Sequence, residues 1–174
     1  MLKNLFKPRS GPRVGDDLYA RAVAQARNPA FYTRLHVADR IDARFELYTL
    51  HVLLLVLRLR DENTAQASDA AQAVFDVYVS ALDHALREEG VGDVSVGKKM
   101  RKLGEAVYGR MNAYETPLRS ADAAVLAEAM ARNVYADAQA EHAAALADYA
   151  LASRAALAGQ DFKAVLATPA WAEV

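Results

Sequence analysis

The chain contains no cysteine among its 174 residues. It therefore has no disulfide, no zinc site built from thiolates, no iron–sulfur cluster held by cysteine and no cysteine nucleophile. This composition is compatible with a reducing compartment but does not identify one. Any metal or catalytic site would have to be built from other side chains.

Long apolar runs are also missing. The uncharged segment LYTLHVLLLVL covers residues 47–57, which is eleven residues, whereas a membrane-spanning helix needs about 20. No apolar run followed by a small-residue cleavage site marks a secretory signal near the N-terminus, so export is not expected. We predict that residues 47–57 belong to the buried central helix of a folded domain.

Motifs of catalysis and cofactor binding are absent as well. The sequence has no Gly-x-Gly-x-x-Gly, Walker or Gly-x-Ser-x-Gly pattern, and GVGDVSVG follows a predicted helix, which favours a structural turn. No histidine lies three or four residues from another, and the Glu-x-x-His spacing of di-iron bundles does not occur. We therefore expect no catalytic set, no metal and no cofactor. His51 stands inside the apolar segment, where an imidazole needs a hydrogen-bond partner such as a carboxylate or carbonyl.

Helical periodicity dominates the remaining sequence, and no alternating strand pattern of useful length occurs. We predict an all-α, compact single-domain bundle of about six to eight helices. Residues 1–15 are expected to form a flexible basic tail, 16–168 the helical domain and 169–174 a C-terminal tail. The expected helices cover 16–27, 29–36, 40–60, 64–89, 96–115, 121–158 and 161–167, the sixth being either one helix or two with a break near Asn133.

The charges are unevenly distributed although the net charge is −1. Residues 1–60 carry eleven basic and five acidic side chains. The basic tail can be read as a soluble extension or as a segment weakly attracted to an anionic membrane surface.

A second basic group stands at the start of the helix expected from Ser95 onward. Cations in a first helical turn oppose the helix dipole at about 0.3–1 kcal/mol each, and an anionic partner would offset that cost. A solvated face remains the alternative. DNA binding is not indicated, because the chain is not basic overall and no helix-turn-helix or base-stacking set accompanies the group. The group comprises Lys98, Lys99, Arg101 and Lys102.

Two segments, FELYTLHVLLLVLRLR and ALREEGVGDVSVGKKMRKLGEAVYGR, resemble the ubiquinol–cytochrome c chaperone family. The likeness covers about residues 39–116. Its most specific matches are residues 86–88, 90–93, 96–100 and 109–110.

The resemblance implies a non-catalytic assembly factor of complex III that binds newly made cytochrome b. The lack of a long presequence favours a bacterial cytoplasmic protein, peripheral on the inner face of the membrane, and leaves a ribosome contact open. The alternative is an adaptor or chaperone for another respiratory or lipid-linked client. The candidate partner-binding residues are the four basic residues Lys98, Lys99, Arg101 and Lys102, together with Asp93, Arg110 and His51.

Overall fold

Helix α3 (Ile41–Asp61) is the centre of the fold. Every residue from Thr49 to Leu59 is buried, which confirms the expected central helix. The computed structural model describes residues 11–88, 90, 92–136 and 140–174, and eight helices and no strand are found in that part. The predicted all-α class is confirmed.

Helices α1 (Gly11–Ala26) and α4 (Ala65–Glu88) pack on each other and on α3. Helix α1 begins before the expected start at Asp16, so residues 11–15 of the expected basic tail belong to it, while residues 1–10 lie outside the described part. Thr64 caps α4, because its hydroxyl accepts a hydrogen bond from the Ala67 amide at 3.2 Å. Gly90 follows α4 with φ of 77°, the left-handed conformation expected for a glycine stop.

The short helix α2 (Ala30–Thr33) connects α1 to α3. We expected Asn28 to cap a helix beginning at Pro29; Pro29 is instead the N-cap of α2, and the Asn28 side chain accepts a hydrogen bond from the Ala30 amide at 3.0 Å. The helix ends before His36, where we expected it to stop, and His36 has a positive φ of 51°.

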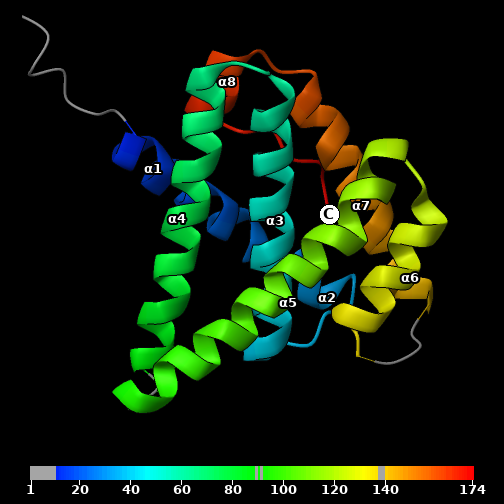
Figure 1. The fold of residues 1–174 in the computed structure, drawn as a ribbon. Coiled ribbons are helices and arrows are strands. Elements are labelled where there is room, and N and C mark those ends of the chain that lie inside the picture. Colours follow the sequence, from blue (N-terminus) through cyan, green and yellow to red (C-terminus); the bar gives the residue numbers. More distant parts are fainter. Residues whose placement is uncertain (1–10, 89, 91, 137–139) are drawn as a thin grey trace, which may run out of the picture.

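Helix α5 (Asp93–Ser120) differs from its expected limits at both ends. Its N-cap is Gly92 rather than Ser95, and Pro117 lies inside the helix rather than closing it. A left-handed Ala121 ends the helix instead. In Figure 1, α5 runs diagonally across α3, and α4 and α5 diverge from their shared turn.

The alanine-rich region forms two helices, α6 (Ala123–Asn133) and α7 (Ala140–Ala158), so of the two alternatives left open by the sequence the structure has the one with a break near Asn133. The two pack closely on each other, and α7 also contacts α3. Asp122 caps α6 by accepting a hydrogen bond from the Val125 amide. Helix α8 (Phe162–Ala167) follows, capped in the same way by Asp161.

The last residues pack on the domain instead of extending from it as the expected tail. The Trp171 ring lies 5.2 Å from the His51 ring, measured between centres. The Ala172 amide donates a hydrogen bond to the Ser153 hydroxyl at 3.1 Å, which fixes the segment to α7.

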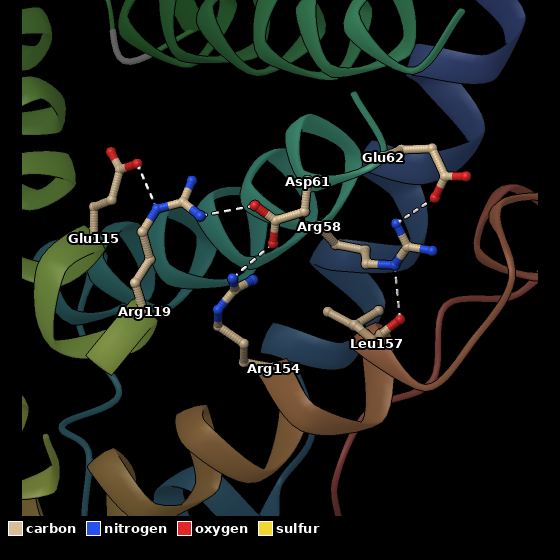
Figure 2. A network of polar contacts seen from close by, with 7 residues as sticks. All are labelled: Arg58, Asp61, Glu62, Glu115, Arg119, Arg154 and Leu157. Carbon is tan, nitrogen blue, oxygen red and sulfur yellow. Dashed lines mark hydrogen bonds and ion pairs between the residues drawn. The ribbon is translucent and has the colours of Figure 1, made fainter. Parts of the chain in front are cut away.

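Charged side chains join three helices at one end of the bundle (Figure 2). Asp61 of α3 accepts hydrogen bonds from Arg119 of α5 at 2.7 Å and from Arg154 of α7 at 2.6 Å. Burial alone would raise the pKa of Asp61, but these two hydrogen bonds and the positive charges outweigh it and hold that pKa below its usual range. Beside them, Arg58 donates to the Leu157 and Gln160 carbonyls at the end of α7. The network therefore fixes α5 and α7 against the end of α3.

Candidate functional site

Helices α4 and α5 form a hairpin whose turn projects from the rest of the molecule (Figure 1). In α4 the buried side chains end at Tyr78, so the last ten residues of that helix, 79–88, contribute none. In the first part of α5, Val96 is buried and the next buried residue is Val107. The distal hairpin is therefore stabilised mainly by contacts between its own two helices.

Partly buried apolar side chains occur along both helices of this hairpin. They recur at helical spacing in the sequence, and the structure covers them only in part. We call them the apolar strip, because they continue from the core toward the turn. The strip consists of Phe75, Leu82 and Leu86 of α4 and Met100, Leu103 and Met111 of α5.

An apolar hollow marks the inner end of the strip, where α3, α4 and α5 meet. Its free volume is only about 10 Å³, and its lining includes Phe75 and Met111 together with Val52, Val56 and Val107. The polar groups beside it are satisfied, since the Thr49 and Tyr78 hydroxyls share a hydrogen bond of 2.6 Å. A helix cannot enter a space of this size, so a partner segment would have to lie on the strip or move α5 outward.

The basic group lies on the exposed side of the same hairpin, on α5. Because α5 begins at Asp93, Lys98 is its sixth residue rather than part of the first turn. The expected conflict with the helix dipole is thus weaker than predicted, since that effect fades beyond the first turn. Arg101 lies 3.7 Å from Glu105, an exposed pair of little energetic value. Among the described ion pairs, none involves the three lysines of the group, Lys98, Lys99 and Lys102.

Arg110 is not a free surface cation. Its guanidinium donates three hydrogen bonds of 2.6–3.1 Å to Glu46 of α3, whose side chain is 5% exposed. Burial raises the pKa of the Glu46 carboxyl, and the hydrogen bonds from Arg110 oppose that rise. The ion pair joins α5 to α3 beside the apolar hollow. The sequence showed Glu46 only as a charge flanking the apolar segment, because its partner lies 64 residues away.

His51 is fully buried and belongs to the core rather than to a surface. Its Nδ1–H donates to the Leu47 carbonyl at 2.7 Å, because a carbonyl oxygen can only accept. The neutral ring then accepts at Nε2 from the Tyr149 hydroxyl, 2.8 Å away, and Gln25 donates to that hydroxyl at 3.1 Å. The expectation of a core histidine bonded to a carbonyl is confirmed, and no surface of His51 is open to a partner. Asp93 begins α5, and its side chain lies outside the described part.

The described residues include no group of three or more histidine, acidic or cysteine side chains placed to hold a metal ion. His36 and His142, far apart in sequence, lie 4.5 Å apart between ring centres. Among the same residues, no helix is both long and apolar enough to cross a membrane.

Comparisons with known proteins agree with this architecture. The family model described as ubiquinol–cytochrome c chaperone matches residues 33–172. The crystal structure of the Cbp3 homolog from Brucella abortus is similar, with 33% sequence identity and a TM-score of 0.87, over 99% of this chain and 97% of that chain. No curated protein sequence matches the chain. The family match covers most of the chain and confirms the resemblance seen in the two sequence segments: the chain belongs to the ubiquinol–cytochrome c chaperone family, whose role is in complex III.

Proposed function

We propose that this protein is a non-catalytic assembly chaperone that binds newly made cytochrome b and holds it during biogenesis of the cytochrome bc complex. The family match supports the chaperone role. The observation that carries the client-binding step is the apolar strip, which lies half-covered along a hairpin that projects from the core. A membrane-protein client exposes apolar helices before assembly, and an apolar helix is held by a groove between two helices.

The apolar strip is expected to bind a client helix weakly and reversibly. Because most of each strip side chain is already buried, covering the remainder contributes about 0.5 kcal/mol. The six strip residues together therefore contribute about 3 kcal/mol. Association itself costs about 4–15 kcal/mol. A client helix is therefore bound loosely unless α5 moves outward and exposes the apolar hollow as well. The Glu46–Arg110 ion pair, which joins α5 to α3, opposes such a movement.

Site-specific photocrosslinking tests the client. A photoreactive residue at Leu86 or Met100 should give an adduct with cytochrome b in membranes where the bc complex is being made. The control position is Val125, which is 47% exposed and belongs to α6, a helix far from the turn between α4 and α5 (Figure 1). Adducts with another membrane protein would instead support the alternative of an adaptor for a different respiratory or lipid-linked client. Equal cytochrome b adducts at all three positions would contradict the role of the strip.

For the membrane location, we propose that the basic group of α5 contacts anionic lipid at the inner face of the bacterial cytoplasmic membrane. Each such contact is worth about 1 kcal/mol and decays within a Debye length, so binding should weaken as salt rises. The test compares co-sedimentation with anionic vesicles for wild type and for a variant in which Lys98, Lys99, Arg101 and Lys102 are all glutamine.

A matched control variant removes the same number of charges elsewhere. Replacing the exposed Arg21, Arg40, Arg60 and Lys163 with glutamine gives the same net charge. The α5 variant should lose sedimentation while the control retains it. Equal loss in both would show that only net charge matters. A parallel sedimentation assay with ribosomes tests the other anionic partner that the resemblance suggests. If wild type binds ribosomes in a salt-sensitive way and the α5 variant does not, the basic group would be assigned to the ribosome instead.

A further inference from the structure

An open, polar hollow lies on a different part of the molecule, between the end of α1, helix α2 and the start of α3. Its volume is about 500 Å³, within the range of small-molecule sites. The hollow is lined by Arg27, Pro29, Tyr32, Thr33, Asp39 and Arg44. No residue of the apolar strip or of the basic group lines it, so it is separate from the proposed client site.

Arg27 is held in a fixed position at this hollow. Its Nε–H donates to the Tyr48 hydroxyl at 2.8 Å, and its guanidinium carbon lies 5.8 Å from the centre of the Tyr48 ring. Among the described residues, Tyr48 is the only hydrogen-bond partner of the Arg27 side chain. The two terminal nitrogens therefore retain their donors for a ligand, and the side chain loses little further freedom on binding.

The second cation of the hollow is already partly neutralised. Arg44 contacts one oxygen of Asp39 through Nε at 2.7 Å and through its terminal nitrogen at 2.6 Å. With Arg27, Arg44 and Asp39 ionised, the lining has a net charge of +1 (two positive charges less one negative). An anion is therefore attracted to the hollow, and Asp39 competes with it for Arg44.

Tyr32 adds a hydroxyl donor to the lining of the same hollow. Its hydroxyl lies 3.5 Å from the Ala26 carbonyl, at the outer limit of a hydrogen bond, and can turn toward a better acceptor. Burial raises the pKa of Tyr32, Tyr48 and Asp39 act in the same direction, and the positive charges of Arg44 and Arg27 only partly oppose them. The Tyr32 hydroxyl therefore keeps its proton and can donate a hydrogen bond to an anionic oxygen.

We propose that this hollow binds a small molecule through an oxyanion group, a carboxylate or a phosphate, which is held by the Arg27 guanidinium and the Tyr32 hydroxyl. A guanidinium presents paired N–H donors that match two oxygens of such a group. Arg44 strengthens the site to the extent that the anion displaces Asp39.

Chemical-shift titration of the full chain tests the proposal, with inorganic phosphate in one arm and acetate in the other. Ionic strength is held constant with sodium chloride. We expect saturable shifts at residues of the hollow in at least one arm, and the arm that saturates at lower concentration identifies the preferred oxyanion. Shifts that chloride reproduces, or that never saturate, would mean an adventitious ion only and would overturn the proposal.

Two variants with opposite expected effects make the test specific. R27Q should weaken binding about tenfold or more, because it removes a charged donor. D39N should tighten binding about threefold, because it releases Arg44 from an exposed ion pair. R21Q, which removes an exposed charge from the same end of the chain, is the matched control and should leave the affinity unchanged. Unchanged affinity in both R27Q and D39N, with a normal thermal melt, would refute the assignment.

Discussion

The buried imidazole of His51 makes stability depend on pH in a direction that the structure fixes. Burial lowers the pKa of His51 to about 4, and the hydrogen bond from Nδ1 to the Leu47 carbonyl opposes this only partly. In the unfolded chain the pKa of a histidine is about 6.5. Between these two values the unfolded chain takes up a proton that the folded protein does not bind. The free energy of unfolding therefore falls as pH falls from about 6.5 toward 4.

The size of this effect follows from the two pKa values. They differ by about 2.5, and each pKa unit corresponds to about 1.4 kcal/mol, so the full loss is about 3 kcal/mol. About 2 kcal/mol of it is lost by pH 5. The assay is chemical denaturation followed by circular dichroism at pH 7 and pH 5.

His51→Gln is the informative variant, because a glutamine amide donates and accepts hydrogen bonds but does not titrate. We expect wild type to lose about 2 kcal/mol more than His51→Gln between pH 7 and pH 5. His84→Gln, which removes an exposed imidazole from α4, is the control for a general effect of histidine loss. Equal pH dependence in wild type and His51→Gln would refute the reasoning, because it would mean that a proton reaches His51 without destabilising the fold.

Three further substitutions test the packing and the polar network by denaturation. Gly15→Ala should destabilise the fold by about 2 kcal/mol, because its Cβ would lie 2.6 Å from the Ala73 carbonyl oxygen and force α1 away from α4. Gly97→Ala should stabilise the fold by about 0.5–1 kcal/mol, since the alanine Cβ would meet no atom within 4 Å. A destabilised Gly97→Ala variant would show that α5 needs a glycine at this position. Asp61→Asn should cost about 1 kcal/mol, because it weakens two ion pairs that are partly exposed to solvent. Asp69→Asn on the exposed face of α4 should have little effect, and equal results for the two variants would mean that the network of Figure 2 adds no stability.

Local patterns in the sequence determined the helical class and several boundaries. The uncharged run of residues 47–57 required a buried helix, because it is too short to span a membrane and too apolar for a surface. The end of α4 before Gly90 was also predictable, since a helix stop depends on residues within one or two turns, whereas the sequence left open whether the alanine-rich region breaks near Asn133. The start of α5 was misplaced by three residues, because both Gly92 and Ser95 are acceptable N-caps and only packing selects between them.

Tertiary structure alone decided which residues meet across the chain. Asp61 pairs with Arg154, 93 residues away, and no spacing rule links them. Leu86 and Met100 are only partly buried, and the helical periodicity of the sequence does not reveal that the neighbours needed to cover them are missing at the projecting hairpin. The burial of His51, the pairing of Arg110 with Glu46 and the polar hollow beside Arg27 likewise arise from the packing of separate helices. A helical pattern specifies which side of one helix is apolar, whereas a site depends on the relative positions of several helices.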